Sequence, residues 1–357
     1  MEITLVKVFA PTALAFVVGM LLTPVISKQL YGHKMWKKKA GKGIAYGGGK
    51  TPIFDQLHKE TDVNTPRLGG IVIWLSVICT ILIVWLFQFI FPHSSLGKLD
   101  FLSRSQTWLP LFALLVGAVV GFIDDVLVVR GTGKHFAGGL PLSQRLLVVG
   151  ATALVSAWWF YEKLDVSTIT LIGHGPVELG VYFIPLFVLI ALGIYASSVI
   201  DGIDGLSGGT FMFIFTAYAA IALYQDQIDL AAYCATVVGG ILAFLWFNVP
   251  PARFYMTETG VMALTMSLTI VAFMTDSIAG GEGVSVLPII GILLVLTVLS
   301  DIVQVLSKKI FKRKIFRVAP LHHHFEAIGW PGAKVTMRYW VLGFVFAAIG
   351  VLLAIAF

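Results

Sequence analysis

Long runs of apolar residues recur along the whole chain, and they restrict its fold more than any other feature of the sequence. With 58% apolar and only 12% charged residues, the composition excludes a soluble globular protein. An α-helix of roughly 20 apolar residues crosses a hydrocarbon core about 30 Å thick. We therefore predict an all-α, polytopic integral membrane protein with about ten transmembrane helices. The predicted spans cover residues 4–26, 68–91, 108–123, 145–161, 181–200, 209–224, 230–247, 260–278, 286–306 and 338–357.

The connections between these spans are too short to hold a separate soluble domain, so we treat residues 1–357 as a single membrane domain. The first span begins with Glu2 and lacks both a basic leader and a small-residue cleavage site, which predicts that it is retained. Cys79 and Cys234 lie inside apolar runs, where a small apolar filler is expected in place of a disulfide or a metal ligand. In the loop 162–180, residues 168–172 before Gly173 are consistent with a short hairpin to residues 177–179.

The positions of lysine and arginine predict the orientation, because short cytoplasmic loops are enriched in both. If alternate connections lie on opposite sides, one side holds only Lys98, Arg104 and Lys163, while Lys7 lies inside the first span. All the other lysines and arginines fall on the opposite side. We therefore predict that both termini are extracytoplasmic. The formal net charge of +6 then reflects topology and attraction to anionic membrane lipids, and it requires no nucleic-acid partner.

Five carboxylates stand out, because ionisable groups beside lipid are costly and usually serve a purpose. They follow the ends of predicted spans, and the predicted topology brings all of them to the cytoplasmic side. The five are Asp124, Asp125, Asp201, Asp204 and Glu258. The run His322-His323-His324 falls on the same side. The sequence therefore predicts an active site at the cytoplasmic face.

Clustered carboxylates beside basic loops suit a hard divalent cation such as Mg²⁺, which binds oxygen ligands and substrate phosphates. Phosphoryl transfer depends on such an arrangement, because charge on the transferring group must be neutralised. The membrane location suggests that one substrate is a lipid phosphate. A cation-coupled secondary transporter is an alternative of another class. Transporters place their ionisable groups near the bilayer midplane, and the middles of these spans carry no carboxylate.

Each motif taken alone leaves alternatives open. Residues 121–125, Gly-Phe-Ile-Asp-Asp, could be a helix end with solvated acids, although adjacent carboxylates repel and favour a bound cation. Residues 201–209 could be only a glycine-rich connection, although the same glycines would allow a ligand to approach the main chain closely. The histidine run could bind zinc, carry protons or be solvated. The wider sequence context is needed to choose between these interpretations.

The segment 316–326, Phe-Arg-Val-Ala-Pro-Leu-His-His-His-Phe-Glu, is followed by Gly-Trp-Pro at 329–331. It resembles a signature of the phospho-N-acetylmuramoyl-pentapeptide transferases (the MraY family), within the polyprenyl-phosphate N-acetylhexosamine-1-phosphate transferases. Other stretches are similar to further motifs of this family: His-Lys at 58–59 with Thr-Pro-Arg-Leu-Gly-Gly at 65–70, Asp-Asp at 124–125, Asp-Gly-Ile-Asp-Gly-Leu at 201–206 and Leu-Trp-Phe-Asn at 245–248. The resemblance therefore covers most of the predicted cytoplasmic surface.

The resemblance implies that undecaprenyl phosphate attacks the sugar-linked phosphorus of UDP-N-acetylmuramoyl-pentapeptide, giving lipid I and UMP in peptidoglycan synthesis. It also implies Mg²⁺ dependence, a place in the bacterial cytoplasmic membrane and a homodimer. A related alternative is transfer of N-acetylglucosamine-1-phosphate to the same carrier, as in the WecA or TagO branch, which generally lacks the Phe-Glu and Gly-Trp-Pro pattern. An inactive family member is a third alternative.

Roles for individual residues are also implied by the resemblance. The expected catalytic residues are Asp124, Asp125, Asp201, His323 and His324, the first two near the lipid phosphate. The expected substrate-binding residues are Lys59, Gly202, Ile203, Asp204, Asn248, Tyr255 and His322. Asp204 would contact the uracil and Tyr255 would stack on it, although Tyr255 is equally consistent with an aromatic side chain at the membrane interface. Glu258 is the expected metal ligand.

The chain departs from the family pattern at a few positions. Glu258 stands where the family usually has a metal-binding aspartate, and glutamate keeps the oxygen ligands while adding one methylene. Ser198 replaces an expected asparagine, and Leu147 stands where a lysine is common, with Lys134 as a nearby substitute. Asp301, in the ninth span, is also unlike the family. These differences concern efficiency and exact substrate more than membership of the superfamily.

Overall fold

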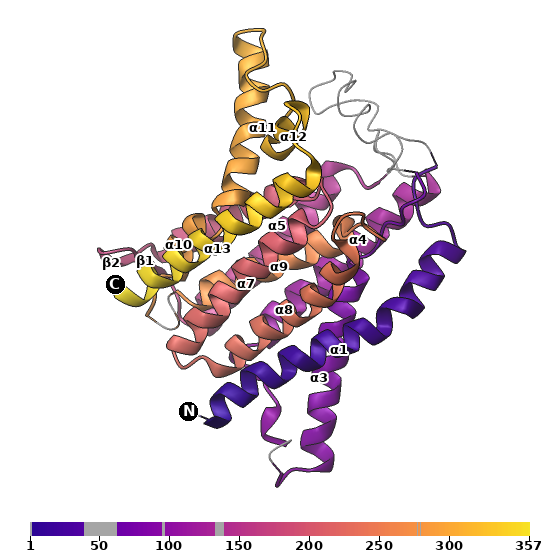
Figure 1. Ribbon diagram of the computed structural model, residues 1–357. Helices are drawn as coiled ribbons and strands as arrows, with labels where there is room; N and C mark the ends of the chain where they lie inside the picture. The colour runs from indigo at the N-terminus through magenta and orange to yellow at the C-terminus, as the bar shows by residue number, and fades with distance from the viewer. Residues whose placement is uncertain (1, 39–62, 95–96, 133–138, 277, 279) are drawn as a thin grey trace.

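The computed structural model describes residues 2–38, 63–94, 97–132, 139–276, 278 and 280–357, and these form a bundle of helices with one small sheet (Figure 1). The predicted all-α class is confirmed. The helices are α1 (Glu2–Gly32), α3 (Ile71–Ile90), α4 (Trp108–Arg130), α5 (Leu142–Lys163), α6 (Phe183–Ala196), α7 (Leu206–Tyr224), α8 (Ile228–Asn248), α9 (Thr257–Met274), α10 (Gly283–Ile290), α11 (Ile292–Ile310), α12 (Leu321–Ala327) and α13 (Gly332–Ala356).

The described part of the chain contains 8 helical stretches that are long and apolar enough to cross a membrane. The pair α10 and α11, bent by 69°, raises this number to 9. The predicted span 145–161 corresponds to α5, whose 22 residues extend about 33 Å at 1.5 Å per residue, but whose first turn contains Arg145. A polytopic membrane protein is thus confirmed, while ten spans and the orientation stay predictions. Several predicted spans are too short, because α1 continues past residue 26 to Gly32, α4 continues past residue 123 to Arg130, and α13 begins at Gly332, before residue 338.

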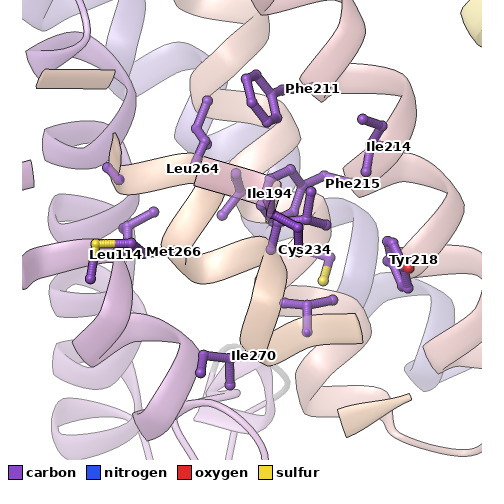
Figure 2. Close-up of a cluster of buried hydrophobic side chains, with 14 of the residues drawn as sticks. Leu114, Ile194, Phe211, Ile214, Phe215, Tyr218, Cys234, Leu264, Met266 and Ile270 are labelled. Atoms are coloured by element: carbon purple, nitrogen blue, oxygen red, sulfur yellow. The ribbon is translucent and has the colours of Figure 1, made fainter. Parts of the chain in front are cut away.

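Helix α9 lies at the centre of the bundle. In the most apolar 18 residues of α9, 94% of the residues are buried, compared with 22% in the same kind of stretch of α1 and 28% in α13. Figure 2 shows side chains of α9 packed among those of α4, α6, α7 and α8; the labelled residues include Leu264, Met266 and Ile270 of α9 with Leu114, Ile194, Phe211, Phe215 and Cys234. Within α9 only Glu258, its second residue, is not buried. A helix that is apolar all round needs this central position, and its one carboxylate lies at its first turn.

Two glycines bring α4 close to α9. Gly117 and Gly121 lie one helical turn apart, and a Cβ atom at either position would collide with the main chain of α9, at Met262 and Glu258 respectively. Small residues at this spacing allow two membrane helices to approach closely. The next turn of α4, which carries the paired aspartates, is therefore held against the start of α9.

A short hairpin caps the other end of α9. Strands β1 (Thr168–Leu171) and β2 (Gly175–Glu178) pair antiparallel, which confirms the predicted hairpin. Asp276, just beyond α9, accepts hydrogen bonds from the main-chain N–H groups of Thr170 and Val284, each at 2.9 Å. In Figure 1 the two chain ends lie on the same side of the bundle as this hairpin, and α12 lies on the opposite side. The two ends of α9 thus belong to two different faces of the molecule.

The charge inside the first span has a partner. Lys7 Nζ lies 2.5 Å from Asp229 Oδ1 in the first turn of α8, and both side chains are mostly shielded. This pairing reduces the cost of an ionisable group in a lipid-facing helix. Cys79 and Cys234 are free thiols, Cys234 buried and Cys79 half-buried, as expected for apolar filling residues.

Candidate active site

Both oxygens of the Asp125 carboxylate accept hydrogen bonds from other elements. Its Oδ1 accepts from Arg67 Nε at 3.2 Å and Nη2 at 2.9 Å. Its Oδ2 accepts from Thr257 Oγ1 at 2.5 Å and from the main-chain N–H and Oγ1 of Thr259 at 2.9 and 2.6 Å. The side chain is fully buried, and these donors fill the acceptor sites of a carboxylate. Asp125 therefore ties α4 to α9 and to the segment before α3, and its expected catalytic role stays a prediction.

Asp124 and Glu258 share one arginine. Arg145, in the first turn of α5, donates from Nη1 to Glu258 Oε1 at 2.5 Å, and its Nε lies 3.9 Å from Asp124 Oδ1. The main-chain N–H of Leu140 also donates to Asp124 Oδ1, at 2.7 Å. The second oxygen of Glu258, Oε2, is buried and has no hydrogen-bond partner within the described residues. The two carboxylates thus face one cation and keep oxygen atoms for a further ligand.

Asp201 is linked to the same cluster through Thr257. It lies in the turn between η3 (Ser197–Ile200) and α7, where Ser207 Oγ donates to its Oδ1 at 2.6 Å and the Thr257 N–H donates to its Oδ2 at 2.8 Å. Burial raises the pKa of Asp201 above its ordinary value, and the hydrogen bonds from Ser207 and Thr257 oppose that shift. Because Thr257 also donates to Asp125, it joins the two aspartates. Its φ of +56° is unusual for a β-branched residue, so these bonds hold a strained backbone in place.

Asp204 and Asn248 shape the loop that carries the Asp-Gly motif. Asp204 Oδ2 accepts from the Ala252 N–H at 2.9 Å. Asn248 is buried, accepts from the Gly205 N–H at 2.9 Å and donates to the Phe254 carbonyl at 2.8 Å. Gly205 has a φ of +74°, a conformation that glycine adopts without strain. Both side chains organise the predicted nucleotide loop, and direct contact with a nucleotide stays a prediction.

The histidine run lies on α12 and reaches the same loop. His322 and His323 are buried, with ring centroids 4.3 Å apart. A Cβ atom at Gly202 would collide with Nε2 of both rings, so this position needs glycine for close packing. His323 Nδ1 lies 2.7 Å from Glu326 Oε2. The structure therefore unites the histidine and Asp-Gly motifs, which lie far apart in the sequence.

For the remaining predicted residues the structure gives main-chain contacts or burial. The Tyr255 N–H donates to the Pro66 carbonyl at 2.9 Å, and the Tyr255 carbonyl accepts from the Gly69 N–H at 2.8 Å. These bonds hold the segment that carries Arg67 beside Asp125. Ile203 is half-buried in the Asp-Gly turn. Lys59 and Lys134 lie outside the described residues, and Leu147 is 70% exposed.

Two arginines without a predicted role complete the cluster. Arg67 lies in the stretch Thr-Pro-Arg-Leu-Gly-Gly, which resembles a family motif, and Arg145 lies in Leu-Ser-Gln-Arg at residues 142–145. A basic residue at the entrance of an apolar helix is a usable signal, because a charge there needs a partner. Their partners could not be named from sequence, since each lies on a helix distant in the chain.

The residues present fit a hard divalent cation. Among the described residues there is no group of three or more His, Cys, Asp or Glu side chains that could hold a metal. Mg²⁺ does not require such a group, because it usually binds through one or two carboxylates together with waters and substrate phosphates. Asp124 and Glu258 offer oxygen ligands, and the buried Oε2 of Glu258 lacks a hydrogen bond. The Asp124–Glu258 pair is therefore the candidate metal site.

The chain is similar in sequence to known proteins. The family model described as glycosyl transferase family 4 matches residues 107–276, a range that contains all five carboxylates. Three proteins called phospho-N-acetylmuramoyl-pentapeptide-transferase are similar to nearly the whole chain. That of Geobacillus sp. (strain WCH70) is 32% identical over 342 residues, covering 95% of this chain and 96% of its own. That of Anoxybacillus flavithermus (strain DSM 21510 / WK1) is 33% identical over 350 residues, 97% of each chain. That of Chloroflexus aggregans (strain MD-66 / DSM 9485) is 32% identical over 341 residues, 91% of this chain and 84% of its own.

Proposed function

The chain belongs to the phospho-N-acetylmuramoyl-pentapeptide-transferase family, and we propose that it transfers phospho-N-acetylmuramoyl-pentapeptide from its UDP-linked form to undecaprenyl phosphate. The products are lipid I and UMP. One observation carries the proposal beyond family membership: acidic and histidine motifs from four separate stretches of the chain converge at one end of an apolar bundle. We place this end at the cytoplasmic face of a bacterial inner membrane.

The reaction joins two phosphorylated substrates, so the site must balance negative charge. Arg67 and Arg145 carry two positive charges against the three negative charges of Asp125, Asp124 and Glu258. These five side chains are therefore net negative, and a divalent cation would supply the positive charge that the substrates need. A lipid phosphate already carries an anionic oxygen at neutral pH, so the attack requires orientation more than a strong base. Asp124, fixed by Arg145 and the Leu140 N–H, fits the role of orienting the attacking group.

Asp124 and Glu258 are the residues that would hold Mg²⁺. The bound metal would neutralise charge on the transferring phosphoryl group and on the departing UMP. Thr257 supports this geometry, because its bonds to Asp125 and Asp201 fix the main chain immediately before Glu258. Glu258 is longer by one methylene than the aspartate usual in the family, and its carboxylate still lies in the cluster, where it accepts from Arg145.

The nucleotide and the diphosphate are assigned to the Asp-Gly loop and α12. The loop around Gly202 lies directly against the rings of His322 and His323. A uridine diphosphate bound along this junction would meet polar groups of the loop and imidazole N–H groups of α12. Imidazole and backbone donors form short, strong hydrogen bonds to phosphate oxygens.

The test is an assay of UMP release by purified protein in detergent or lipid nanodiscs. With undecaprenyl phosphate and UDP-N-acetylmuramoyl-pentapeptide we expect release that requires Mg²⁺ and stops with a chelator. UDP-N-acetylglucosamine is the matched alternative donor. Release from UDP-N-acetylglucosamine with none from the muramoyl substrate would overturn the proposed donor.

A further inference from the structure

Helix α11 carries a stripe of buried polar side chains, although its other faces are apolar and exposed. The stripe consists of Thr297, Ser300, Gln304 and Ser307, all buried, at helical spacings of three and four residues. The neighbouring Leu299, Ile302 and Leu306 are each close to half exposed. A buried polar group in such a helix is costly unless it is hydrogen-bonded. The stripe therefore needs partners. Thr297 donates to the Leu293 carbonyl within α11, whereas Ser300, Gln304 and Ser307 bond main-chain groups of residues 313–321.

Both polar atoms of the Gln304 amide form hydrogen bonds to the main chain of this segment. Its Oε1 accepts from the main-chain N–H groups of Ile315 and Phe316 at 3.1 and 3.0 Å. Its Nε2 donates to the Phe316 carbonyl at 2.8 Å. Farther along the segment, Ser300 Oγ accepts from the N–H of Leu321, the first residue of α12, at 2.9 Å. Two donors at the oxygen and one acceptor at the nitrogen fix the amide orientation without ambiguity.

The residue after Phe316 connects this anchor to a histidine. The Arg317 N–H donates to His324 Nδ1 at 3.2 Å, and the Phe316 ring meets His324 edge to face with centroids 5.5 Å apart. An N–H group can only donate, so Nδ1 of His324 is the acceptor and its ring proton is on Nε2. Among the described residues no group bonds that Nε2. His324 therefore presents a hydrogen-bond donor at its outer nitrogen.

His323, the neighbouring residue, is fixed in the opposite sense. Its Nδ1 faces the Glu326 carboxylate at 2.7 Å, and because a carboxylate oxygen accepts, Nδ1 carries the proton and donates. His323 therefore carries a proton on Nδ1, whereas Nδ1 of His324 carries none. Only the tautomer of His324 is set by the segment that Gln304 holds. The main chain at Phe316 and Arg317 decides which nitrogen of His324 can donate.

We propose that Gln304 is a positioning residue that fixes His324 with its proton on Nε2, where it donates to a diphosphate oxygen of the sugar nucleotide. The identity of that ligand rests on the proposed function, whereas the tautomer follows from the hydrogen bonds alone. Gln304 itself touches no reacting group in this arrangement. It acts on His324 through the main chain of Phe316 and Arg317.

The kinetic test is a double-mutant cycle on full-length protein in nanodiscs. Gln304→Met keeps the side-chain length and removes all three hydrogen bonds, so we expect kcat/KM for the sugar nucleotide to fall about tenfold, the effect of losing one hydrogen bond to a charged group. In a His324→Ala background the same substitution should cause no further loss, because residues acting as a unit are not additive. Full additivity of the two losses would overturn the proposal.

A matched control and a spectroscopic readout separate positioning from general stability. Gln225→Met removes the hydrogen bond to the Thr275 carbonyl at the opposite end of α9, and it should leave kcat/KM unchanged. Nitrogen NMR of histidine-labelled protein, with His324 assigned by difference among 8 histidines, should show the Nε2–H tautomer in wild type and a mixture in Gln304→Met. An unchanged tautomer in that variant would overturn the proposal. If wild type releases no UMP from either donor, the proposed function fails, and the NMR result still decides the role of Gln304.

Discussion

Replacing Asp125 by asparagine tests whether this carboxylate holds the fold together or takes part in the chemistry. Asparagine keeps the shape but has one acceptor oxygen, and its NH₂ group would face either Arg67 or the pair Thr257 and Thr259. Arg67, with 18% of its side chain exposed, loses its charged partner at 2.9 Å. The substitution therefore removes the negative charge beside a largely buried cation, and it leaves either Arg67 or the donors of Thr257 and Thr259 without an acceptor.

The expected cost follows from these contacts. Removing one partner of a buried ion pair costs about 3–5 kcal/mol. A chain of this size shifts its Tm by roughly 2 °C per kcal/mol, so the Tm should fall by about 6–10 °C. Thermal unfolding in nanodiscs can be followed by the fluorescence of the 9 tryptophans. The loss of UMP release should parallel the loss of folded protein.

The adjacent residue is a matched control, because it undergoes the same chemical change in a different environment. In Asp124→Asn the amide oxygen can still accept from the Leu140 N–H, and Arg145 keeps Glu258 as its partner. We expect a Tm change within about 2 °C and a loss of UMP release on the order of 100-fold. If Asp125→Asn kept the wild-type Tm and lost activity, the structural assignment of Asp125 would be refuted.

Three further predictions follow from the same cluster. Glu258→Gln should raise the Mg²⁺ concentration required for half-maximal UMP release about tenfold, and an unchanged Mg²⁺ dependence would exclude Glu258 as a ligand. Gly121→Ala should destabilise the protein by about 1–3 kcal/mol because its Cβ meets the main chain at Glu258, whereas Gly150→Ala, which points into open space on α5, should be neutral or stabilising in the same unfolding assay. Ser207→Ala removes a hydrogen bond that lowers the pKa of Asp201, so that pKa should rise further and the acid limb of the pH–rate profile should move to higher pH; an unmoved limb would mean that ionised Asp201 is not required.

Much of the architecture was predictable because it depends on local sequence. Apolar runs of about 20 residues predict helices in lipid, and residues 168–172 and 177–179 around Gly173 are consistent with the hairpin. The acidic and histidine motifs were expected on one face, and the structure brings them together through Thr257 and Gly202. The boundary of α4 was missed because Asp124 and Asp125 look like the end of an apolar run, whereas their partners on other helices allow the helix to continue to Arg130.

The sequence by itself determined that the protein lies in a membrane, where its helices are and which residue types form the site. Hydropathy and charge can be read from neighbouring residues. Only the tertiary structure distinguished Asp124 from Asp125, which carry the same signal in sequence but face different partners. Arg67 and Thr257 lie 58 and 132 residues from Asp125, and their bonds depend on the close approach of α4 and α9 at Gly117 and Gly121. Gln304 likewise gains its role only when α11 folds beside the segment that precedes the histidines. Such pairings arise from packing between distant helices, which no local pattern specifies.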